Sequence, residues 1–161
     1  MKSSVKSRQQ DYISRLTKLY SSVETWIERT DLKAIRNTVE LNEEVPGRYE
    51  APTLKILDAQ GKKVAELLPV GAWIIGAEGR VDLVGLLDRN GLVYLREGGP
   101  HIQVTESEGP KDSREWTRPL FKGVEQTGWY WIGEPRRGRA HPLPKELFLD
   151  LLSEVSDYDV R

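Results

Sequence analysis

Between Arg36 and Arg96, apolar and polar residues alternate along the chain, with short glycine-containing breaks. Alternation with a period of two puts one face of a strand in a core and the other in water. The pattern predicts strands at 37–42, 52–58, 62–69, 72–76, 80–87 and 92–96. Because short turns join strands that run in opposite directions, these strands are expected to form an antiparallel meander. Pro69 and Gly71 should bend or bulge it, since proline cannot donate to a central ladder.

Two of the breaks share one motif, in which an aspartate is followed three residues later by a glycine. The first is Asp58 to Gly61 and the second is Asp88 to Gly91. An aspartate side chain accepts hydrogen bonds from turn amides, and glycine adopts a positive φ without steric cost. Both glycines are therefore predicted to have a positive φ.

Helical periodicity flanks this region on both sides. From Ser7 to Thr30, large apolar residues recur every three or four positions, as on one face of an amphipathic helix. A second such stripe runs from Pro144, a residue that suits a first helical turn, to Ser156. The predicted class is α+β, a curved antiparallel sheet of about six to eight strands with both helices packed on it. Residues 1–6 are expected to be disordered.

The chain of 161 residues has the length of a single globular domain, predicted to span 1–161. Residues 97–115 are rich in glycine, proline, serine and charge, which predicts a mobile loop around a short strand at 101–105. The aromatic run bracketed by Gly128 and Gly133 predicts another strand.

Composition narrows the function classes. The chain has no cysteine, which excludes disulfides and thiol chemistry, and only two histidines, which excludes a three-histidine metal site. The formal net charge is −1, so no overall field points to nucleic acid or membrane. No apolar run approaches the roughly 20 residues of a membrane-spanning helix. A cytoplasmic protein is the expectation.

The most distinctive chemistry lies near the C-terminal end, where an aromatic strand precedes an arginine-rich loop. Residues 111–146 contain eight basic and five acidic side chains. Guanidinium groups suit phosphates and carboxylates, and indole rings can stack on bases. The alternative is that the arginines pair with acidic neighbours and the aromatic rings fill the core. The predicted binding residues are Trp129, Trp131, Arg136, Arg137, Arg139 and His141.

A second candidate is a metal site at Asp82, with Glu97 as a nearby carboxylate. An aspartate on a strand, followed by acidic and lysine ligands on the next strand, is typical of nucleases that bind Mg²⁺. The next strand here ends in Arg96 and Glu97 and lacks that pattern. The alternative is a structural ion pair between Arg80 and Asp82.

These observations favour a non-catalytic binding or interaction module without a cofactor, whose partner is nucleic acid or an acidic protein surface. The competing hypothesis is a Mg²⁺-dependent hydrolase that uses Asp82 and Glu97. A third is a subunit that dimerises through an exposed apolar stripe, and the sequence leaves monomer and homodimer open.

Overall fold

A computed structural model describes residues 2–74, 76–107, 113–133 and 138–160. Two helices and nine strands follow one another along this part of the chain. Their bounds are α1 (Lys2–Ile27), β1 (Lys33–Glu43), β2 (Gly47–Leu57), β3 (Lys63–Gly71), β4 (Arg80–Gly85), β5 (Arg89–Leu95), β6 (His101–Ser107), β7 (Ser113–Pro119), β8 (Gly128–Ile132), β9 (Ala140–Pro142) and α2 (Lys145–Ser156).

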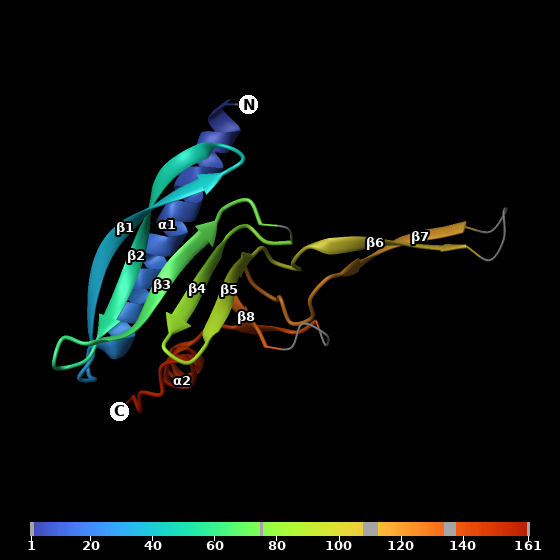
Figure 1. The fold of residues 1–161 in the computed structure, drawn as a ribbon. Helices are drawn as coiled ribbons and strands as arrows, with labels where there is room; N and C mark the ends of the chain where they lie inside the picture. Colours follow the sequence, from blue (N-terminus) through green and yellow to red (C-terminus); the bar gives the residue numbers. More distant parts are fainter. Residues whose placement is uncertain (1, 75, 108–112, 134–137, 161) are drawn as a thin grey trace.

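Seven of the strands form one sheet in the order β1-β2-β3-β4-β5-β8-β9, and every neighbouring pair is antiparallel. The first five strands are a meander, as the alternation predicted. The register shifts between Pro69 and Gly71, where a bend or bulge was expected. The predicted α+β class, with a helix at each end of the sequence, is confirmed (Figure 1).

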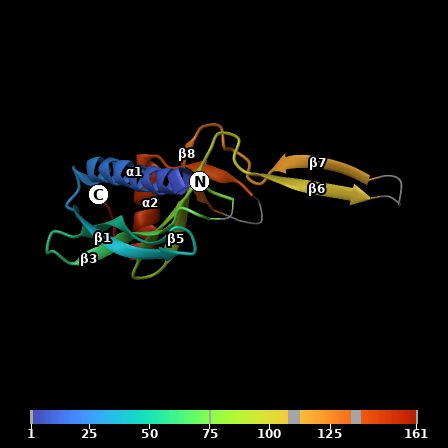
Figure 2. The same cartoon turned by 90° about the horizontal axis from the view of Figure 1, so that it is seen from above.

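Both helices cover the same face of the sheet (Figures 1 and 2). Helix α1 contacts β1 and β2, and α2 contacts β3, β4 and β5. The amphipathic stripes therefore serve the core. Leu16 of α1, Leu83 of β4 and Leu151 of α2 are each at most 1% exposed. One cluster contains them, with Trp26 and Trp73 packed at its margin.

A smaller cluster lies on the other face of β5, β8 and β9. Leu95, Tyr130 and Ala140 form it together with Val124 of the loop after β7. The Tyr130 hydroxyl donates to the Gln126 carbonyl oxygen at 2.6 Å and so fastens the loop to β8. At this end of the molecule the sheet is covered on both faces.

Strands β6 and β7 pair only with each other and extend from the body as an arm (Figures 1 and 2). The predicted strand at 101–105 is confirmed inside β6, but the irregular loop expected over the rest of 97–115 is wrong for 106–107 and 113–115. Polar side chains at Gln103 and Thr117, opposite one another, weakened the apolar alternation that identifies strands. Residues 108–112 lie outside the described residues.

Two further predictions are wrong. Residues 2–6 belong to α1, because that helix begins at Lys2. The predicted strand at 72–76 is absent from the described residues 72–74 and 76, where Ile74 and Ala77 form an isolated bridge. This segment instead supplies backbone groups to side chains. The Glu43 carboxylate accepts from the amides of Ala72 and Trp73, each at 3.1 Å.

Candidate anion-binding edge of the sheet

Strands β8 and β9 bring together two of the predicted binding residues. Trp131 is in register with His141, and their ring centroids are 5.6 Å apart. Both side chains are half-buried. The Trp131 indole nitrogen donates to Asn90 Oδ1 at 3.3 Å, so its orientation is fixed by β5. The two rings are tilted by 37° to one another, with Trp131 on β8 and His141 on the edge strand β9, and Trp131 also packs against the main core.

Two exposed cations continue this edge. Arg139 precedes β9 and forms an isolated parallel bridge with Lys122. Two backbone hydrogen bonds hold the bridge: Lys122 N donates to the Gly138 oxygen at 2.6 Å, and Ala140 N donates to the Lys122 oxygen at 2.8 Å. Alternation from His141 places Arg139 on the same face of the sheet as the two rings, and bridge partners share a face. We call Lys122, Trp131, Arg139 and His141 the basic edge.

The cations of the basic edge are not neutralised within the described part of the chain. Neither Lys122 nor Arg139 has a carboxylate within 4.0 Å there. Arg118, at the end of β7, likewise forms no ion pair with a described residue. The alternative interpretation, in which the arginines pair with acidic neighbours, therefore does not hold for Arg139 among the described residues, Asp150 and Glu154 of α2 included.

The other predicted members of the site differ in their outcome. Arg136 and Arg137 lie outside the described residues. Trp129 turns towards α1, where its indole nitrogen donates to the Arg15 oxygen at 3.4 Å and its ring contacts Tyr94 edge-on at 5.3 Å. Like Trp131, it is half-buried and packs against the main core. Lys122 was missed, because a lone lysine after an irregular segment carries no sequence signal.

A pocket of about 500 Å³ adjoins the basic edge. Gly123, next to Lys122, and Pro142, next to His141, contribute to its wall together with Trp129. Glu125, Gln126, Thr127 and Leu143 line much of the remainder. The pocket offers polar and apolar surface beside the cations, and its charged lining residue is the exposed Glu125.

Asp82 is engaged in ion pairs. It is 3% exposed, and its two carboxylate oxygens meet Arg80 Nε at 2.8 Å and an Arg89 terminal nitrogen at 3.0 Å. Gly91 faces Asp82 across the β4–β5 ladder, and a Cβ at Gly91 would lie 3.0 Å from the Arg80 guanidinium. The predicted positive φ at Gly91 is wrong, whereas Gly61 has φ +83°. The position requires a glycine because a larger residue would collide with the Arg80 side chain that lies across it.

The structure gives the metal hypothesis no further ligands. Among the described residues, no group of three or more histidine, aspartate or glutamate side chains could hold a metal ion. Glu97 is exposed, and its amide donates to the Thr127 hydroxyl at 3.0 Å. With both oxygens of Asp82 facing guanidinium groups, the structural Arg80–Asp82 pair considered from the sequence is present.

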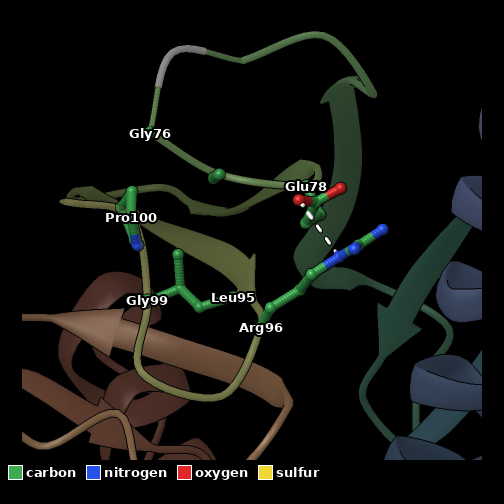
Figure 3. A pocket seen from close by; sticks show the side chains of 7 residues that line it. Gly76, Glu78, Leu95, Arg96, Gly99 and Pro100 are labelled. Carbon is green, nitrogen blue, oxygen red and sulfur yellow. Dashed lines mark ion pairs between the residues drawn. The ribbon is translucent and has the colours of Figure 1, made fainter.

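A second pocket, of about 280 Å³, lies between β5 and the segment before β4 (Figure 3). Glu78 and Arg96 point across it and pair at 3.3 Å, and Leu95 and Pro100 supply apolar walls. Because its one acid and one base neutralise each other, this pocket has weaker electrostatic preference than the basic edge.

Two tyrosines with raised pKa values, Tyr12 and Tyr49, lie where the β1–β2 hairpin meets the end of β3. Burial raises the pKa of Tyr12 far above its ordinary value, and the Glu43 charge adds to the shift. Burial also raises the pKa of Tyr49, whose hydroxyl donates to the Glu43 carboxylate. The Tyr12 hydroxyl donates to the Arg80 oxygen at 2.5 Å and accepts from the Gly71 amide at 3.2 Å. These hydroxyls stay protonated and serve the fold.

Comparison with known proteins adds no assignment. No protein-family model, no curated protein and no solved structure matches this chain. Neither helix of the described chain is long and apolar enough to cross a membrane. Function therefore has to be argued from the surface itself.

Proposed function

We propose that this chain is a non-catalytic binding module that takes an anionic partner at the basic edge. The observation that carries the proposal is the Lys122–Arg139 bridge. Its two backbone hydrogen bonds hold the main chains of two exposed basic residues side by side, and neither residue forms an ion pair with a described carboxylate. Like charges held together repel, and an anion between them relieves that repulsion.

The neighbouring groups suit phosphate or carboxylate. A guanidinium presents a planar fork of donors, and a lysine ammonium adds a point charge beside it. The Trp131–His141 pair supplies an aromatic surface at the same edge. Aromatic surface next to cations is the combination that grips single-stranded nucleic acid, through stacking and backbone contacts together. Nucleic acid is therefore the favoured partner, and an acidic protein surface is the second.

The decisive experiment is a salt titration of oligonucleotide binding with matched charge variants. K122Q/R139Q removes two cations from the basic edge. K18Q/K62Q removes two exposed cations from α1 and the β2–β3 turn, neither of which forms an ion pair with a described residue. Fluorescence anisotropy of a labelled single-stranded DNA gives the dependence of log affinity on log salt.

Each phosphate contact contributes about −0.7 to that slope for a single strand. The K122Q/R139Q slope should therefore be shallower than wild type by about 1.4, and the K18Q/K62Q slope should be unchanged. Equal slopes for the two double variants would refute the basic edge as the site. The partner would instead be an acidic protein surface if no oligonucleotide binds and an acidic polypeptide raises the Tm of the wild type but not that of K122Q/R139Q.

A further inference from the structure

The β1 edge of the sheet is long and uncovered within the described chain. Eight of the eleven residues of β1 are exposed, and no proline or glycine interrupts it between Lys33 and Glu43. The other edge is β9, which has three residues and ends in Pro142. Short strands and prolines are the usual protection of a sheet edge against pairing with another chain. The β9 edge has both, whereas β1 is long and has only its charged side chains as protection.

The register shows which backbone groups of β1 face outward. Thr38 lies opposite Pro52, which has no N–H to donate. Their pairing is therefore the non-hydrogen-bonded type, in which the N–H and C=O of Thr38 point away from β2. The Thr38 amide accordingly donates to the side chain of Asn37, at 2.9 Å. By alternation, the even-numbered residues from Ala34 to Asn42 present their backbone groups along the edge.

We propose that a second copy of this chain pairs with β1, in antiparallel register about a two-fold axis at Thr38. In this register Arg36 of each copy lies opposite Glu40 of the other, and Lys33 lies opposite Glu43. Opposite charges at directly facing positions stabilise a strand pair, and like charges destabilise it. The strand is thus complementary in charge to its own antiparallel copy. A register centred on Asn37 would place Arg36 opposite Thr38 and lose both pairs.

The apolar residues of β1 fit the same arrangement. Ile35 is 50% and Val39 is 37% exposed, on the face of β1 away from Arg36. In the Thr38-centred register, Ile35 lies opposite Leu41 of the second copy, and Val39 lies opposite Asn37. Leu41 is half-buried and packs against the core of its own chain, so each Ile35–Leu41 contact would mainly cover the exposed side chain of Ile35.

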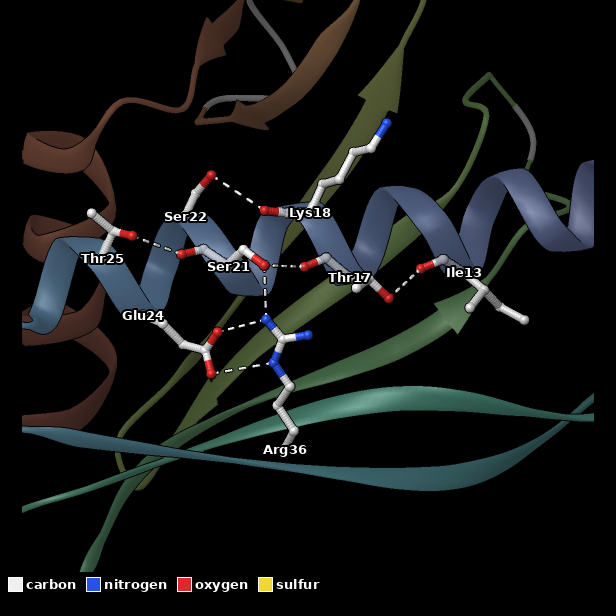
Figure 4. Close-up of polar contacts among 8 residues, drawn as sticks. All are labelled: Ile13, Thr17, Lys18, Ser21, Ser22, Glu24, Thr25 and Arg36. Atoms are coloured by element: carbon white, nitrogen blue, oxygen red, sulfur yellow. Dashed lines mark hydrogen bonds and ion pairs between the residues drawn. The ribbon is translucent and has the colours of Figure 1, made fainter.

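Arg36 retains a free donor for the second copy. Its Nε and Nη2 contact Glu24 of α1 at 3.2 and 2.5 Å, and Nη2 also contacts the Ser21 hydroxyl at 2.8 Å (Figure 4). The remaining nitrogen, Nη1, has no hydrogen bond to the described residues (Figure 4). Glu40 has only a 3.7 Å contact with Arg48, and both of these side chains are more than half exposed. Helix α1 therefore holds Arg36 in place while leaving it able to bind a further carboxylate.

Cysteine cross-linking tests the register directly, because the chain contains no cysteine. In T38C the two new cysteines lie directly opposite each other at a position where the backbones of the two strands are hydrogen-bonded. The Cα atoms of such a pair are about 5.5 Å apart, which allows a disulfide to form. In N42C the two cysteines are offset along the paired strands by eight residues, or about 27 Å, because position 42 lies opposite position 34 of the second copy. T38C should form a covalent dimer under mild oxidation, and N42C should remain monomeric. Equal cross-linking of the two variants would overturn the register.

The mass in solution tests the dimer without a new cysteine. Light scattering of the wild-type chain should give twice the mass of one chain, and T38P, which removes the central outward N–H, should give a monomer with unchanged circular dichroism. E40K places a lysine opposite Arg36 and should weaken dimerisation at least tenfold, while E154K makes the same charge change at an exposed position of α2, away from β1, and should not. A wild-type monomer at the highest soluble concentration would refute the proposal, as would equal dimerisation of E40K and E154K.

Discussion

Gly85, the last residue of β4, should tolerate no side chain. A Cβ there would lie 2.3 Å from the carbonyl oxygen and 2.9 Å from the side chain of Val155 in α2. That oxygen accepts from the amides of Leu87 and Asp88, at 2.8 and 3.2 Å. Gly85→Ala must therefore displace the end of α2 from the β4–β5 turn by about 1 Å, because non-bonded carbon atoms approach to about 3.5 Å.

The size of the effect follows from the groups that move. Overpacking costs about 1–3 kcal/mol, and each of the two hydrogen bonds to Val155 contributes about 0.5–1.5 kcal/mol. A gain of about 0.4–1 kcal/mol from stiffening the unfolded chain offsets a small part. The free energy of unfolding should fall by about 1–6 kcal/mol, which corresponds to a Tm lower by about 2–24 °C for a chain of this length.

Urea unfolding followed by circular dichroism measures this change, and Gly128→Ala is the matched control. Gly128, the first residue of β8, has no positive φ, and its Cβ would have nothing within 4 Å. Its substitution should alter the free energy of unfolding by less than about 0.5 kcal/mol. If Gly85→Ala and Gly128→Ala unfold at the same urea concentration, α2 does not dock on β4 as described.

Two further predictions concern the junction of β1, β2 and β3. Glu43→Ala leaves the Ala72 and Trp73 amides and the Tyr49 hydroxyl without their acceptor. The free energy of unfolding, measured in urea, should therefore fall by about 1–3 kcal/mol. A fall of less than about 0.5 kcal/mol would contradict this role of Glu43. Alkali should destabilise the fold, since Tyr12 and Tyr49 have raised pKa values and the unfolded chain releases protons above about pH 10 that the folded chain retains. Below pH 10 neither group changes stability with pH, and above it each contributes a fall of up to about 1.4 kcal/mol per pH unit. Tyr12→Phe should make the alkaline fall shallower in unfolding measurements at several pH values, and an unchanged slope would contradict the burial of its hydroxyl.

The sequence predicted the meander and helices because their periodicity reflects burial. Val81 and Leu83 alternate with Asp82, and the structure puts the two apolar residues against the helices and Asp82 on the other face. The aspartate–glycine turn motif predicted the φ of its glycine at only one of its two occurrences. Asp58 caps its turn through the amides of Gln60 and Lys62 and Gly61 follows with a positive φ.

Gly91 resembles Gly61 in sequence but differs for a reason that no local pattern carries. It lies inside β5, and its missing side chain makes room for Arg80 of the neighbouring strand. A requirement set by another strand cannot be read from the turn motif. The same limit applies to the basic edge: the Trp131–His141 pair follows from a register between β8 and β9, and Lys122 joins it only through a bridge across 17 residues.

The β6–β7 hairpin also bears on how quickly the sheet can close. Strands β5 and β8 are neighbours, yet 32 residues separate Leu95 from Gly128. A hairpin forms from local contacts, and once β6–β7 has paired, the Leu120 amide reaches the Pro100 oxygen at 2.8 Å. The chain left to close then amounts to 13 residues on the two sides of the hairpin. Because closure entropy grows with the logarithm of loop length, this shortening lowers the entropic barrier to β5–β8 pairing by about 0.8 kcal/mol. We therefore expect the last two strands to join the sheet about four times faster than they would if a flexible linker of the same length replaced the arm.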